Sequence, residues 1–87
     1  MPDIEIPESF RRRLQRKTPQ LQGAILECVQ RLGDDPRHSG LRTHRVQGAV
    51  GVWEARVDRG NRLTFHWEGE KIVLRNHCNY DILTRNP

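Results

Sequence analysis

Arginine and histidine side chains supply most of the potential chemistry in this chain. Between residues 37 and 62 the sequence holds six arginines and two histidines against two acidic residues. Arginine binds phosphate through paired hydrogen bonds, and histidine transfers protons near neutral pH. Together they suit cleavage of a phosphodiester bond, in which arginines stabilise the developing charge. RNA is the expected substrate because its 2′-hydroxyl is a built-in nucleophile.

Eight residues are the candidates for such a site. The catalytic candidates are His44, Arg56, Arg62, His77 and Tyr80, and the additional phosphate-binding candidates are Arg42, Arg45 and Arg75. Which of the two histidines and the tyrosine transfers the proton stays open, because that choice needs hydrogen-bond geometry. Tyrosine also serves as a half-buried anchor, and a histidine on a strand can simply be solvated.

The sequence predicts neither a metal nor a cofactor. Its two cysteines, Cys28 and Cys78, lack the spacing of a zinc site, and no carboxylate cluster is present for magnesium. The glycines form neither a GxGxxG nor a GxxxxGK pattern, so they indicate turns and not a phosphate loop. We therefore expect chemistry that uses only side chains.

Length and composition predict one small basic domain over residues 1–87. The chain has a mass of 10.2 kDa, a net charge of +4 and an isoelectric point near 9.8. The positive charge favours an anionic partner, and a core of this size gains from a bound partner. No apolar run approaches the length of a signal sequence or a membrane span, so we expect a cytoplasmic protein without membrane contact.

Two helices are predicted before the glycine and proline break at residues 33–40. The first opens at Pro7 and Glu8 and buries Phe10 and Leu14. The second has Thr18 as its N-cap, followed by apolar residues at three-and-four spacing. Gly33 is expected to cap this helix in the left-handed conformation.

The apolar period then changes from that of a helix to that of a strand. Two hairpins are predicted over residues 53–67 and 62–77, with turns at 59–61 and 69–70. A strand over 41–46 and a short edge strand over 4–6 extend them. We therefore predict an α+β fold in which two N-terminal helices pack on a mostly antiparallel sheet of three or four strands.

One face of this sheet is predicted to be polar and strongly basic. The register places Arg62 opposite His77, and Thr64 opposite Arg75. His44 falls beside Glu54 or Ala55, depending on the register of its strand. The alternative is a solvated lattice of ion pairs, with Asp58 on Arg62 and Glu54 near Arg56, which would contribute little stability.

Nearly the whole chain resembles the RelE/ParE superfamily of bacterial type II toxins. The resemblance lies in the segments PRHSGLRTHRVQG, GVWEARVDRGNRLTF and IVLRNHCNYDIL. It implies a fold like that of small microbial ribonucleases and, most often, a ribosome-dependent endonuclease that cuts messenger RNA and so inhibits translation. By position, Arg56 and Arg62 would hold the scissile phosphate, and His44 would act as a base or phosphate contact. Where many members read GTHxxL, this chain reads CNYDIL, which puts Tyr80 in place of the histidine.

The resemblance also implies partners and two alternative functions. A cognate antitoxin with acidic and apolar residues would cover the basic face, and such pairs can assemble into a higher-order toxin–antitoxin complex. The ribosome and messenger RNA would be the targets. ParE-like members of the superfamily instead poison DNA gyrase and cut no RNA. A catalytically silent RNA-binding member is the other alternative.

Overall fold

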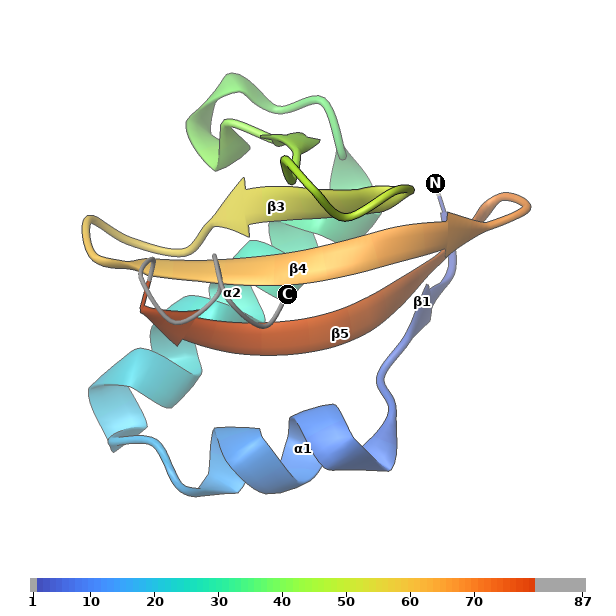
Figure 1. Cartoon of the computed structure of the whole chain (residues 1–87). Helices are drawn as coiled ribbons and strands as arrows, with labels where there is room; N and C mark the ends of the chain where they lie inside the picture. Colours follow the sequence, from blue (N-terminus) through green and yellow to red (C-terminus); the bar gives the residue numbers. More distant parts are fainter. Residues whose placement is uncertain (1, 80–87) are drawn as a thin grey trace.

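The computed structural model describes residues 2–79, and the chain there forms two helices, a short 3₁₀ turn and five strands (Figure 1). In chain order these are β1 (Ile4–Glu5), α1 (Glu8–Gln15), α2 (Pro19–Asp34), the 3₁₀ turn η1 (Ser39–Leu41), β2 (His44–Arg45), β3 (Val52–Arg56), β4 (Asn61–Glu68) and β5 (Lys71–Asn79). No helix within residues 2–79 is long and apolar enough to cross a membrane.

The five strands form one mixed sheet in the order β1-β5-β4-β3-β2. Neighbouring strands are antiparallel except β1, which pairs in parallel with the start of β5. The α+β class and the short edge strand near the N-terminus are confirmed, although the sheet has five strands where three or four were predicted. The predicted strand over 41–46 is much shorter, because η1 and the left-handed Arg42 (φ 48°) interrupt it.

The two helices begin where the sequence predicted. Pro7 precedes α1, and the Thr18 hydroxyl accepts a hydrogen bond from the Leu21 N–H (3.2 Å) at the start of α2. The predicted cap at Gly33 is wrong, because α2 continues to Asp34 and its cap residue, Asp35, is extended. Gly33 instead leaves room for Ile4: a Cβ there would lie 3.2 Å from the Ile4 Cδ1 atom.

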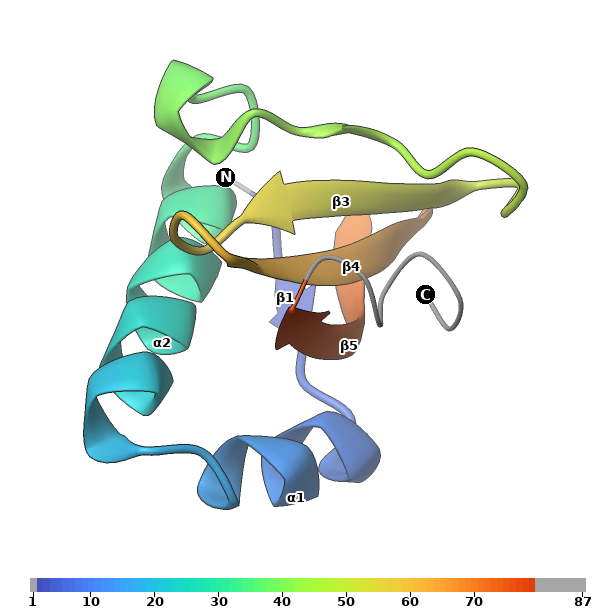
Figure 2. The same cartoon turned by 60° about the vertical axis from the view of Figure 1, so that its left-hand side comes forward.

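Both helices lie on one side of the sheet, so its two faces have different surroundings (Figure 2). We call the side that carries Ala55, Leu63 and Phe65 the core face, because these side chains are buried with the apolar residues of α1 and α2. The opposite side, which carries Glu54, Arg62 and Thr64, is the polar face. Alternation along β3 and β4 sends adjacent residues to opposite faces.

The hairpin of β3 and β4 keeps the predicted faces but moves the pairing by two residues. Ala55 pairs with Leu63, and Trp53 pairs with Phe65. The predicted three-residue turn at 59–61 implied Phe65 and Trp67 as their partners. A shift of two residues leaves every side chain on its face. The longer turn is favoured because the Asp58 carboxylate accepts hydrogen bonds from the N–H groups of Gly60 and Asn61, both 3.0 Å, and from the Asn61 amide, 2.9 Å.

A bulge in the hairpin of β4 and β5 changes the faces themselves. The pairing runs as predicted from Glu68 and Lys71 to Phe65 and Leu74, and then shifts by one residue. Beyond the bulge Thr64 pairs with Asn76, and Leu63 pairs with His77. A shift of one residue exchanges inside and outside, so the predicted placement of His77 beside Arg62 is wrong.

Candidate active site

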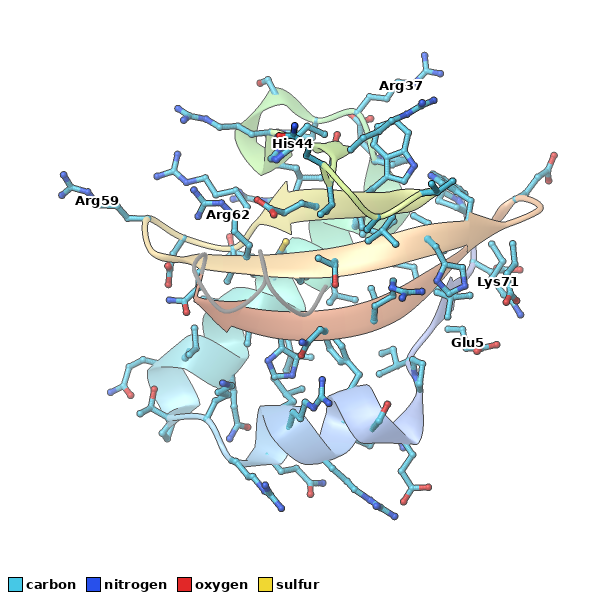
Figure 3. The ribbon with its side chains drawn as sticks, in the orientation of Figure 1. Glu5, Arg37, His44, Arg59, Arg62 and Lys71 are labelled. Carbon is cyan, nitrogen blue, oxygen red and sulfur yellow. The ribbon has the colours of Figure 1, made fainter. Side chains whose placement is uncertain are left out.

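The polar face brings together one carboxylate, one histidine and two arginines from three adjacent strands. His44 of β2 pairs with Glu54 of β3, and Arg56 at the end of β3 pairs with Arg62 at the start of β4. Figure 3 shows His44 and Arg62 on the same side of the sheet, in front of β3 and β4. The structure thus selects the Glu54 register for His44, one of the two that the sequence left open.

Glu54 lies at the centre of this group and is buried. Only 4% of the residue is exposed, whereas 54% of the His44 side chain is exposed. The Glu54 Oε1 atom lies 3.4 Å from the His44 Nε2 atom and 3.7 Å from the Arg62 Nε atom. This Oε1 atom has no hydrogen-bond partner in the described part of the chain, so its acceptor capacity is unused, and the Arg62 guanidinium is the positive charge beside it.

The His44 ring faces an oxygen atom at each nitrogen. Its Nδ1 atom is 2.9 Å from the Arg42 carbonyl oxygen, and its Nε2 atom faces the Glu54 carboxylate. A neutral imidazole donates from only one nitrogen, whereas the imidazolium donates from both. Each ring nitrogen therefore lies near an acceptor oxygen, and the ring itself is more than half exposed. The left-handed backbone of Arg42 aims the carbonyl at the ring.

Backbone carbonyl groups of the turn between β3 and β4 orient the two arginines. The Arg62 Nη1 group donates to the carbonyl oxygens of Asp58 (2.7 Å) and Asn61 (2.9 Å), and the Arg56 Nε group donates to Asp58 O (3.4 Å). Directly opposed guanidinium groups repel each other, so this pair favours a bound anion.

The Asp58 carboxylate shapes the turn through its hydrogen bonds and also interacts with the charge of Arg62. Burial by itself raises its pKa, but the hydrogen bonds from Asn61 and Gly60, together with the charge of Arg62, hold this pKa below its ordinary value. The alternative reading of the basic face placed the Asp58 carboxylate on Arg62. In the structure, Arg62 instead contacts the Asp58 backbone oxygen.

His77 is absent from this group because it lies on the core face. It is 1% exposed, its Nε2 atom is 3.1 Å from the Phe10 carbonyl oxygen, and its ring packs edge-on against the Phe10 ring at 4.4 Å. Burial lowers its pKa, nearby Lys17 and Arg13 lower it further, and the Phe10 hydrogen bond opposes them. A neutral ring in this position joins α1 to β5, which is a structural role.

The remaining predicted residues are distributed around the polar face. Arg42 is exposed beside His44, whereas Arg45 is on the other side of β2 and stacks over the Trp53 ring, 5.2 Å from its centroid. Arg75 is exposed at the bulge, where its Nη1 group is 3.2 Å from the His66 Nδ1 atom. Tyr80 lies outside the described residues.

A basic pocket lies next to the polar face, on its β5 side. It has a volume of about 310 Å³, and its lining includes Arg13, His66 and Arg75. Arginine side chains from α1 and β5 and a histidine from β4 therefore meet near the bulge. Such a pocket suits a second phosphate of an extended anionic ligand.

Sequence reasoning missed the central role of Glu54. It considered this residue only as a neighbour of Arg56 or His44, because an acidic residue in an alternating strand is normally solvated. The sequence did carry a signal for this role. Glu54 is the only acidic residue in β3, and one of the two possible registers places it directly across from His44. Its burial could not be deduced from one strand.

This arrangement can bind a phosphate and move a proton. Arg56 and Arg62 supply positive charge, His44 offers an exposed imidazole, and Glu54 lies against that ring. Among residues 2–79, no three histidine, cysteine or acidic side chains come together as a metal site.

The fold is that of known toxins, although the sequence is distant from theirs. No protein-family model and no curated protein sequence matches the chain. A YoeB/ParE toxin from Agrobacterium tumefaciens superposes with a TM-score of 0.72 at 13% identity, over 90% of this chain and 98% of that one. YafQ from E. coli strain BL21(DE3) gives 0.70 at 16% identity, over 95% and 98%. An archaeal RelE in a RelE–RelB complex from Pyrococcus horikoshii OT3 gives 0.70 at 16% identity, over 90% and 93%.

Proposed function

We propose that this protein is the toxin of a type II toxin–antitoxin system and that it inhibits translation by cleaving messenger RNA on the ribosome. The RelE/ParE-like fold supports the first part, and the group of His44, Glu54 and Arg62 on the polar face supports the second. Such a protein acts in the cytoplasm, where its targets are found.

The proposed reaction is an internal transesterification of RNA. The 2′-oxygen of the ribose bonds to the adjacent phosphorus, and the bond from phosphorus to the 5′-oxygen of the next nucleotide breaks. The 2′-hydroxyl proton leaves to a base, and the departing 5′-oxygen receives a proton. The products are a 2′,3′-cyclic phosphate and a free 5′-hydroxyl, so no external reactant is required.

His44 is assigned to proton transfer because it combines exposure with fixed polar contacts at both ring nitrogens. Its Nε2 atom faces the Glu54 carboxylate, and its Nδ1 atom lies 2.9 Å from the Arg42 carbonyl oxygen, so the ring is held in one orientation. Glu54 acts through His44 and is a positioning residue. Tyr80 stays a prediction for the opposite proton transfer.

The arginines are assigned to the phosphate. Arg62 and Arg56 flank the scissile group, where their charge stabilises the pentavalent transition state. Arg42 lies beside His44, and the basic pocket at Arg75 accommodates a neighbouring phosphate. A strand of RNA would then follow the polar face from β2 towards β5.

The antitoxin is the proposed partner that keeps this activity in check. Two of the matching solved structures are RelE–RelB complexes and one is a DinJ–YafQ complex. A partner with acidic residues would neutralise the basic face of a chain of net charge +4 and block access of RNA.

The observation that supports the nuclease assignment is the grouping of Arg62 with the buried Glu54, the exposed His44 and the cross-strand Arg56 on the polar face. We would induce wild-type protein, Arg62→Ala and Arg59→Ala in bacteria and map messenger RNA 5′ ends on translating ribosomes. Arg59 is a matched control, since it is an exposed arginine of the same turn that points away from the group (Figure 3).

New cuts in phase with codons are expected for wild type and Arg59→Ala. For Arg62→Ala we expect a loss on the order of 100-fold, the usual cost of removing one transition-state contact. Growth arrest with intact messenger RNA would contradict the nuclease assignment and favour a gyrase inhibitor. A DNA supercoiling assay would then test that alternative. Normal growth with folded wild-type protein would contradict the toxin assignment.

A further inference from the structure

An aromatic pocket opens on the core face, away from the polar face. It has a volume of about 420 Å³ and lies beyond the end of α2, where the helix no longer covers the sheet. Its lining residues are Pro36, Arg37, Thr43, Trp53, Phe65 and Trp67. Both tryptophans of the chain are among them.

The lining of this pocket is apolar and partly open to solvent. Trp67 is 39% exposed, an unusual exposure for a large aromatic side chain, and it contacts the buried Phe65 edge-on with 6.3 Å between ring centroids. Pro36 and Thr43 are held together, because the Thr43 hydroxyl donates to the Pro36 carbonyl oxygen (3.3 Å). The pocket is therefore preformed by linked elements.

Two arginines border the pocket, and no acidic residue lines it. Arg37 extends outward from the turn after α2 (Figure 3), and Arg45 stacks over the outer part of Trp53. Within residues 2–79 neither guanidinium forms an ion pair. An apolar cavity with a cationic rim is complementary to an apolar side chain flanked by carboxylates.

We propose that this pocket is a docking site for an acidic peptide segment of a partner protein, which inserts one bulky apolar side chain between Trp53 and Trp67. The flanking carboxylates of the segment pair with Arg37 and Arg45. Because the pocket faces away from His44 and Arg62, such a segment holds the partner without occupying the polar face. The inference does not depend on RNA cleavage.

An unpaired nucleobase is disfavoured as the occupant. A base needs hydrogen-bond partners for its edge, whereas the Thr43 hydroxyl already donates to Pro36 and no amide or carboxylate side chain lines the pocket. An aliphatic side chain has no such requirement, and its burial against aromatic rings contributes favourable binding free energy by removing apolar surface from water.

The test uses short synthetic peptides in which a single leucine stands among glutamates. Binding is followed through the fluorescence of the two pocket tryptophans and, independently, by calorimetry on the full chain. Two counterparts serve as controls, one with alanine in place of leucine and one with lysines in place of the glutamates. A single-stranded RNA oligonucleotide is titrated in parallel.

Saturable binding of the glutamate and leucine peptide is expected. The affinity of the alanine counterpart for the wild-type protein, and that of the leucine peptide for Trp67→Ala, should each be about tenfold lower, as for the anchor residue of an interface. Arg37→Glu is expected to weaken binding of the leucine peptide by roughly three- to tenfold. Arg11→Glu is the control, because it changes the net charge by the same amount as Arg37→Glu but lies on the exposed side of α1 and does not line the pocket. It is expected to leave the peptide affinity unchanged.

Three results would overturn this proposal. They are absence of saturable binding by the glutamate and leucine peptide, equal binding of the lysine counterpart, and equal weakening by Arg11→Glu and Arg37→Glu. Competition by the RNA oligonucleotide that Trp67→Ala abolishes would assign the pocket to nucleic acid instead. If Trp67→Ala fails to fold by circular dichroism, the Arg37 and Arg11 pair decides the question alone.

Discussion

The two faces of the sheet each bury a titratable side chain, but they treat it in opposite ways. On the core face His77 is neutral, is hydrogen-bonded to Phe10 and packs against an aromatic ring. On the polar face Glu54 lies between His44 and the cation Arg62. One oxygen atom of Glu54 lacks a hydrogen bond within the described residues, as does the His77 Nδ1 atom on the core face. Burial without charge contributes to the fold, whereas burial of a charge beside other charges prepares a site for chemistry.

The largest expected effect is a loss of stability when a buried side chain on the core face, next to the candidate site, is shortened. Leu63 is fully buried between Arg62 and Thr64, so Leu63→Ala leaves a cavity and is expected to lower the free energy of unfolding by about 2–5 kcal/mol. Urea denaturation of the purified protein measures this. Arg62→Ala, adjacent in β4 but on the polar face, should cost less stability. Equal losses would show that the two faces are not energetically distinct.

A smaller effect, on activity and not on stability, is expected from Glu54→Gln. The change removes the carboxylate that faces His44, so under the proposed function messenger RNA cleavage should fall on the order of 100-fold. The free energy of unfolding should stay the same or rise, because a buried carboxylate with an unused acceptor is costly.

A double variant distinguishes a positioning role of Glu54 from a direct one. If Glu54 acts through His44, then Glu54→Gln in a His44→Gln background should cause little additional loss of cleavage. Additive losses would mean that the carboxylate reaches the substrate by itself. Large destabilisation by Glu54→Gln would contradict the contrast between the two faces.

The smallest expected effect is a pH dependence of stability that originates at His77. Its pKa in the folded protein is depressed, so its contribution is fully present above the unfolded value of about 6.5 and is lost as the pH falls through that value towards the folded one. His77→Gln keeps a donor for Phe10 but cannot titrate, and should therefore flatten the decline in unfolding free energy below pH 6.5. Parallel pH profiles for the two proteins would exclude His77 as the source.

The local features of this protein were predictable because they depend on neighbouring residues. Thr18 followed by proline starts α2, Gly69 takes a positive φ of 61° in the turn between β4 and β5, and alternation along β3 and β4 assigns their faces. Each follows from backbone sterics or from burial of every second side chain. Arg56 and Arg62 were therefore placed on the polar face correctly.

The errors arose where a specific side-chain contact, distant in sequence or within a turn, outweighed the preference that residue types suggested. Gly33 lies inside α2 because Ile4 packs against it, and the Asp58 carboxylate lengthens a turn that residue types alone suggested to be shorter. The bulge opposite Thr64 and Phe65 moves His77 from the polar face to the core. No pattern in β5 indicates this bulge, since alternation continues on both sides of it.

By itself the sequence determined the basic character of the chain, the order of helices and strands, and which residues of β3 and β4 face away from the helices. Periodicity and charge are local properties, which is why they could be deduced without coordinates. Only the tertiary structure decided that Glu54 is buried between His44 and Arg62 and that His77 is excluded from the site. Both outcomes depend on strand register, and register is determined by packing across the whole sheet.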